Sequence, residues 1–129
     1  MEIELIFFRV QNQQFGVEIK SINRIISTKQ VSAKQIKRSQ IPIIDLDSYF
    51  MLNGHKQKTK REIIIIELDG IKKGLLVDEI LRILVLNVDR VKLIPSFIKK
   101  TAQKDYFWAI AQVEHELIPL LDVRKLMVS

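Results

Sequence analysis

The segment 61–86, REIIIIELDGIKKGLLVDEILRILVL, is the strongest constraint on how this chain can fold. It begins with isoleucine at every position from 63 to 66, and a β-branched run without helical period is typical of a buried strand. Asp69-Gly70 follows, a dipeptide that readily adopts the positive φ angles of a tight hairpin turn. Two further apolar runs, 74–77 and 80–86, complete the segment. The pattern predicts a β-meander or the wall of a small barrel.

Length and composition indicate one globular domain that spans residues 1–129. Hydrophobic residues make up 47% of the chain, which argues against disorder, and no apolar run approaches the roughly 20 residues that span a bilayer. The chain begins with Glu2 and Glu4 where an export signal would be basic, and it contains no cysteine. We therefore expect a cytoplasmic protein with no direct membrane insertion.

The formal net charge of +6 raises the question of an acidic partner. No acidic residue lies between Glu18 and Asp45, and a second basic stretch without acids covers residues 55–61. These stretches fit either solvated loops or a nucleic-acid-binding surface. Aromatic side chains for base stacking are not interleaved with the basic ones, so the nucleic-acid-binding small barrel is kept as the alternative.

The rest of the chain also has strand patterns. Residues 2–10 and 15–19 predict a first hairpin, and Tyr106 onward predicts a last hairpin with its turn at Glu114-His115-Glu116. Pro42 places the short apolar run 41–46 at a sheet edge or at the start of a strand. Short helical turns are expected after Asp45 or Asp47 and after Asp122, and loops at 27–40 and 97–104.

An internal repeat relates the two halves of the chain. A constant offset of 58 residues places Gly16 on Gly74 and Ile22 on Ile80, and an offset of 77 places the run 41–46 on the run 118–123. The repeat predicts two similar small β-units. Closure of each unit into a barrel would remove exposed sheet edges.

Motifs for catalysis or metal binding are not found in the sequence. The two histidines, His55 and His115, lie in a basic segment and in a predicted turn. The carboxylates of Asp45, Asp78 and Asp122 each follow an apolar run, where capping a turn is their ordinary role. We therefore expect neither enzymatic activity nor a cofactor or metal site.

Four motifs, in their order and spacing, resemble CheW-like domains over nearly the whole chain: FGVEI at 15–19, IPIIDL at 41–46, GLLVD at 74–78 and LLD at 120–122. The most specific part is the pattern Gly-x-x-Val-Asp-x-Ile-x-x-Ile-Leu that begins at Gly74. The resemblance implies an all-β fold of two five-stranded SH3-like β-barrels packed together. It also implies a non-enzymatic scaffold that couples the cytoplasmic tips of chemoreceptors, the methyl-accepting chemotaxis proteins, to the regulatory domain of the histidine kinase CheA.

The resemblance also suggests which residues contact partners. Motif position places Ile22, Arg24 and Ile83 near a receptor groove between the barrels, with Ile80 and Ile83 on one wall. Core packing is the alternative for Ile22 and Ile83. Arg38 stands where the family has an arginine, in a segment shorter than usual and without the usual glycines, and Arg24 replaces a common acidic residue. Self-association through an exposed barrel edge is a third possibility.

Overall fold

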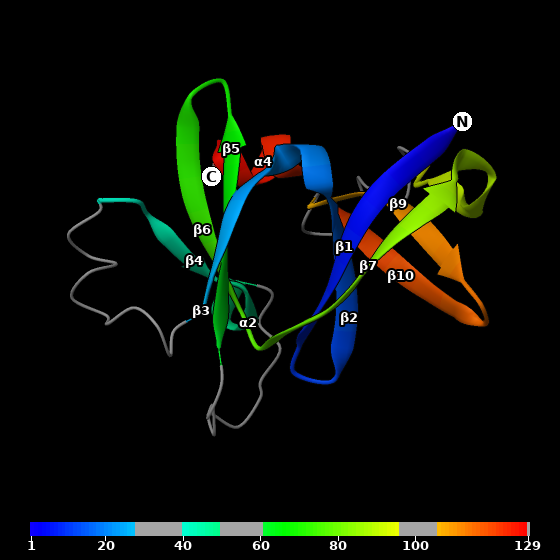
Figure 1. The fold of residues 1–129 in the computed structure, drawn as a ribbon, viewed down its shortest axis with the longest axis horizontal. Helices are drawn as coiled ribbons and strands as arrows, with labels where there is room; N and C mark the ends of the chain where they lie inside the picture. Colours follow the sequence, from blue (N-terminus) through cyan, green and yellow to red (C-terminus); the bar gives the residue numbers. More distant parts are fainter. Residues whose placement is uncertain (28–39, 50–60, 96–105, 129) are drawn as a thin grey trace.

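The computed structural model describes residues 1–27, 40–49, 61–95 and 106–128, and these contain ten strands in two sheets (Figure 1). The predicted loops at 27–40 and 97–104, together with Arg38 and His55, lie largely or wholly outside the described residues. The six-stranded sheet has the order β7 (Glu79–Asn87), β1 (Glu2–Val10), β2 (Gln13–Glu18), β10 (Glu116–Leu121), β9 (Phe107–Val113), β8 (Val91–Leu93). The four-stranded sheet has the order β3 (Ile22–Ser27), β5 (Glu62–Leu68), β6 (Ile71–Val77), β4 (Ile43–Asp45).

The isoleucine run forms the centre of β5, as predicted. All four isoleucines are at most 2% exposed, and β5 pairs with β3 on one side and β6 on the other. The turn between β5 and β6 has Asp69 at φ 53° and Gly70 at φ 81°, so the predicted Asp-Gly hairpin is also confirmed. The backbone geometry of this turn explains the glycine, because positive φ is unfavourable for most other residues.

The internal repeat is present in the strand pairing. Phe7 lies opposite Gly16 in the first hairpin, and Ile65 lies opposite Gly74 in the hairpin of the second half, which is the same pairing shifted by 58 residues. The parallel strands obey the offset of 77 in the same way, because Ile43 pairs with Gly74 and Leu120 pairs with Gly16. The structure therefore confirms two related β-units.

The two units exchange their third strands. β3, from the first half, pairs with β5, whereas β7, from the second half, pairs with β1. The two exchanged pairings are again equivalent, since Ile25 lies opposite Ile64 and Ile83 lies opposite Ile6. Each sheet thus contains strands from both halves, and neither half can complete its sheet without the other.

Two apolar clusters stabilise this arrangement. The inter-sheet core joins the facing surfaces of the two sheets and also takes in the short helices α2 (Leu46–Tyr49) and α4 (Val123–Met127). Its fully buried residues include Ile6, Phe8, Val17, Ile64, Ile66, Leu75 and Leu126. The second cluster lies on the other face of β1, within the curled six-stranded sheet, and contains Leu5, Phe7, Ala109, Ala111, Ile118 and Leu120. β1 is therefore buried on both faces, which is why its sequence becomes continuously apolar.

The all-β prediction is confirmed, and the helical segments are short. Asp45 accepts a hydrogen bond from the backbone of Asp47 at the start of α2, and Asp122 accepts one from the backbone of Arg124 at the start of α4. Pro42 precedes the edge strand β4, as expected. The strand β8 and the 3-10 helix η2 (Val88–Arg90) before it were not predicted from the sequence. In the part of the chain that the structure describes, no helix is long and apolar enough to cross a bilayer.

Candidate functional site

The exchanged strands β3 and β7 carry four of the five predicted contact residues. Ile22 on β3 lies opposite Ile66, and Ile80 on β7 lies opposite Phe8. Both side chains are partly buried against the inter-sheet core. Opposite residues of an antiparallel pair share one face of the sheet, so the core extends through Ile22 and Ile80 toward the surface.

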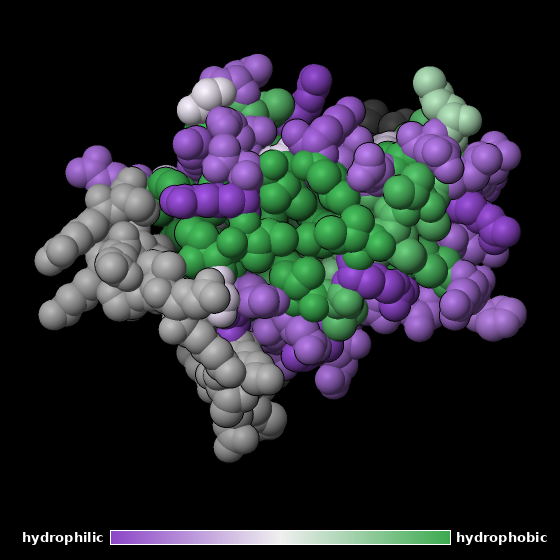
Figure 2. All heavy atoms as spheres, in the orientation of Figure 1, coloured by the Kyte–Doolittle hydropathy of each residue, from purple (hydrophilic) through white to green (hydrophobic). Residues whose placement is uncertain are grey.

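Farther along the same strands the apolar surface becomes exposed. Ile25 is 42% exposed, Ile83 is 58% exposed, and Val85, two residues after Ile83 on the same face of β7, is 52% exposed. We call Ile22, Ile25, Ile80, Ile83 and Val85 the apolar band. Figure 2 shows apolar side chains as a continuous band across the face of the molecule on which β3 and β7 lie. The strand β3 of the four-stranded sheet forms one wall of the band, and β7 of the six-stranded sheet forms the other.

The predicted residues differ in how they fit this band. Core packing accounts for Ile22 but not for Ile83, which is more than half exposed. Arg24 lies opposite Ile65 and therefore on the other face of β3 from Ile25. Its repeat equivalent, Arg82, has the same placement on β7 and stacks on the ring of Phe7 at 5.6 Å. Arg38 lies outside the described residues.

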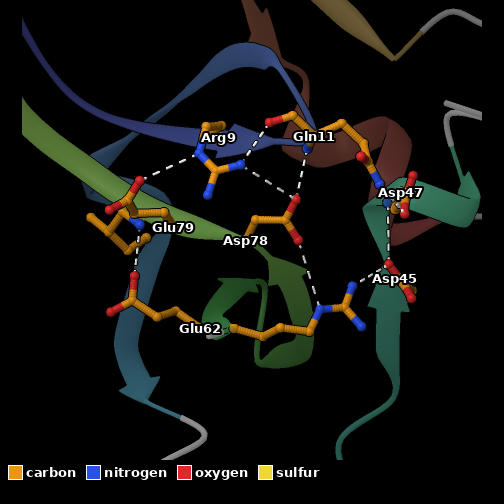
Figure 3. Close-up of polar contacts among 9 residues, drawn as sticks. Arg9, Gln11, Asp45, Asp47, Glu62, Asp78 and Glu79 are labelled. Carbon is orange, nitrogen blue, oxygen red and sulfur yellow. Dashed lines mark hydrogen bonds and ion pairs between the residues drawn. The ribbon is translucent and has the colours of Figure 1, made fainter. Parts of the chain in front are cut away.

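A polar cluster, which we call the Asp78 corner, lies at one end of the sheet junction (Figure 3). Asp78 is only 8% exposed, and its Oδ2 accepts a hydrogen bond of 2.7 Å from the backbone N–H of Gln11. The Gln11 side-chain amide donates at 2.7 Å to Asp47, itself 7% exposed. The cluster comprises Arg9, Gln11, Asp47, Arg61 and Asp78.

The two arginines complete the corner. Arg9 donates at 2.7 Å to the carbonyl oxygen of Gln11 and lies 3.8 Å from Asp78. Arg61 donates at 2.7 Å to Asp45 and lies 3.9 Å from the other oxygen of Asp78. Buried carboxylates require such partners, because an unpaired buried charge is strongly unfavourable.

The role of Asp78 differs from the one expected from the sequence. It was expected to cap the turn that follows its own apolar run, whereas it caps the turn between β1 and β2, which is 67 residues away in sequence. Gln11 in that turn has φ 57°, so the carboxylate holds a backbone conformation that is unusual for glutamine. Sequence reasoning did not identify Arg9, Gln11 or Arg61. The available signal was Arg9, a charged residue between the apolar residues Phe8 and Val10.

The described residues show no cluster of three or more His, Cys, Asp or Glu side chains that could hold a metal ion. His115 is exposed in the turn between β9 and β10, where Glu114 has φ 56°, as expected for the predicted hairpin.

Comparison with known proteins gives a consistent result. The sequence matches the CheW-like domain family over residues 4–129. The chemotaxis protein CheW of Klebsiella aerogenes is 22% identical over 137 aligned positions, which cover 98% of this chain and 82% of that protein. The crystal structure of the scaffolding protein TtCheW from Thermoanaerobacter tengcongensis matches with a TM-score of 0.75 and 19% identity, covering 95% of this chain and 90% of that one. At that identity the structural match shows a shared fold.

Proposed function

The chain belongs to the CheW-like domain family, and we propose that it is a chemotaxis coupling scaffold that joins chemoreceptors to the histidine kinase CheA. Membership of the family, supported by the likeness to a CheW scaffold along nearly the full chain, is the observation that carries this proposal. It favours the scaffold over the nucleic-acid-binding alternative. The role is non-enzymatic and cytoplasmic, with recruitment to membrane-bound receptor arrays.

The apolar band is the surface that we assign to the receptor tip. Its residues lie on one face, with exposure rising from the partly buried Ile22 and Ile80 to the half-exposed Ile25 and Ile83. A receptor tip is a helical hairpin, and an amphipathic helix binds by placing its apolar side chains in such a surface. Isolated exposed isoleucines would need no explanation, but a band continuous with the core is typical of an interaction site.

The regulatory domain of CheA is the second proposed partner, and it binds a surface separate from the apolar band. A scaffold must hold both partners at once, so the two surfaces cannot overlap. This separation gives the proposal a distinctive consequence, because a substitution in the band should weaken receptor binding and leave kinase binding unchanged.

The experiment that tests the function is a pull-down of the full chain against two probes. One probe is a cytoplasmic fragment of a chemoreceptor from the same organism, and the other is the regulatory domain of its CheA. Each probe should be retained alone, and both should be retained together in a ternary complex. Retention of neither probe would refute the scaffold role, whereas retention of duplex DNA at low salt, lost steeply as salt rises, would support the nucleic-acid alternative instead.

A further inference from the structure

The two walls of the apolar band belong to different sheets, so their relative position depends on how the sheets are held together. β3 is part of the four-stranded sheet and β7 is part of the six-stranded sheet. The inter-sheet core is apolar in all its buried members. Apolar packing is not directional, whereas hydrogen bonds between buried polar groups have defined geometry.

The Asp78 corner provides such directional contacts between the sheets. Gln11 lies in the turn of the six-stranded sheet, and its side chain bonds to Asp47 on α2, which directly follows β4 of the other sheet. Arg61, next to β5, bonds to Asp45 at the end of β4 and approaches Asp78. The corner therefore ties the turn of one sheet to the end of the other (Figure 3).

The same corner fixes the start of β7. Three consecutive residues, 78–80, form hydrogen bonds with residues elsewhere in the fold. Asp78 is bonded through its backbone to Arg9 and through its carboxylate to Gln11. Glu79 accepts from Arg9 at 3.3 Å, and the backbone N–H of Ile80 donates to Glu62 at 2.6 Å. Ile80 is the first residue of the apolar band on β7, so these contacts determine where that wall begins.

Among the described residues, the opposite end of the junction does not have this arrangement. The offset of 58 places Lys20 at the position equivalent to Asp78, and the Lys20 side chain is 78% exposed, with Glu18 at 3.3 Å. A cleft of about 530 Å³ is found there, and it is lined by Lys20 and by residues of both sheets, among them Glu67, Leu68 and Trp108. The Asp78 corner thus closes one end of the junction, whereas the cleft beside the equivalent residue, Lys20, leaves the other end open.

We infer that the Asp78 corner positions the two walls of the apolar band, and that Gln11 and Asp78 determine receptor affinity without touching the receptor. This inference rests on the proposed receptor-binding function. The corner acts through the placement of Ile80 and Ile83 relative to β3.

An exchange of donor and acceptor in the hydrogen bond between the side chains of Gln11 and Asp47 tests the inference. Gln11→Glu brings two carboxylates to the distance of a hydrogen bond and should weaken binding of the receptor fragment by about tenfold or more. Addition of Asp47→Asn restores a donor and an acceptor with the roles exchanged, and binding should return to within about threefold of the wild-type affinity. Asp78→Asn should weaken binding like Gln11→Glu.

Asp122→Asn is the matched control. It alters a carboxylate that also accepts a backbone hydrogen bond, at the start of α4 and outside the corner. Asparagine caps a helix about as well as aspartate, so this variant should leave both the melting temperature and the receptor affinity unchanged. Wild-type affinity in Gln11→Glu and Asp78→Asn, or equal weakening in Asp122→Asn, would overturn the inference.

Amide hydrogen exchange separates this inference from the proposed function, because it needs no partner. In Asp78→Asn the amides from Ile80 to Ile83 should exchange at least about tenfold faster relative to the Ile64 amide than they do in the wild type. Unchanged relative exchange would contradict the positioning role even if the receptor binds. Failure of the wild-type protein to bind the receptor fragment would refute the proposed function and leave the exchange result to decide whether the corner holds β7.

Discussion

Replacement of Gly16 by alanine tests the packing between the parallel strands β2 and β10. A Cβ at Gly16 would lie 2.7 Å from Leu120 Cδ2 and 3.1 Å from Cε1 of Phe7, and both neighbours are fully buried. Carbon atoms prefer separations of about 3.5–4.0 Å, so the added methyl group is about 1 Å too close. Overpacking of this kind destabilises by about 1–3 kcal/mol. The reduced entropy of the unfolded chain offsets about 0.4–1 kcal/mol, which leaves a net loss of about 1–2 kcal/mol.

A double-mutant cycle with Leu120→Ala isolates the clash. The leucine truncation alone should destabilise by about 2–5 kcal/mol, because Leu120 is buried. In the double variant the methyl group of Gly16→Ala meets no leucine, so the combined loss should be smaller than the sum by about 1–2 kcal/mol. Urea unfolding followed by circular dichroism gives all four stabilities. Strict additivity, or a stabilising Gly16→Ala, would refute the reasoning.

Three further predictions follow from burial and backbone geometry. Ile64→Ala should lower the free energy of unfolding by about 2–5 kcal/mol and Ile83→Ala by less than about 1 kcal/mol, because of the two only Ile64 is fully buried. Equal losses of stability in urea unfolding would contradict the assigned exposure. Gly70→Ala should destabilise by about 1–2 kcal/mol because its φ is 81°. Truncation of a neighbour should give no rescue, since no atom of the described residues lies within 4 Å of the added Cβ, and a neutral effect on thermal unfolding would contradict the turn geometry. Asp122→Ala should remove the cap of α4 and lower stability by about 0.5–2 kcal/mol, and an unchanged melting temperature would count against the cap.

The strand pattern could be predicted because it is local. The isoleucine run, the Asp-Gly turn and Pro42 before an edge strand each follow from the residues themselves, and the offset of 58 already contains the pairing of Phe7 with Gly16. The exchange of third strands could not be predicted. The repeat looks the same whether β3 pairs with its own half or with the other, because equivalent strands have equivalent sequences.

The candidate site was predictable only in part. The sequence indicated Ile22, Ile80 and Ile83, but it could not show that Ile83 is exposed while Ile22 packs on the core, because an apolar strand pattern does not reveal which of its side chains the other sheet covers. The Asp78 corner has no local signature, since its partners are brought together only by the strand exchange. Arg24 illustrates the limit of motif position, because the bulge near it decides which face of β3 it occupies.

Receptor binding by a variant of the apolar band tests the central claim most directly. Titration of the receptor fragment into Ile83→Glu should show a loss of affinity of at least about 2 kcal/mol, roughly 30-fold, while binding of the CheA regulatory domain is unchanged. Leu117→Glu is the matched control, because Leu117 is 69% exposed on β10 and is not part of the band. The account predicts wild-type receptor affinity for Leu117→Glu. Wild-type affinity for a folded Ile83→Glu would show that the band does not bind the receptor.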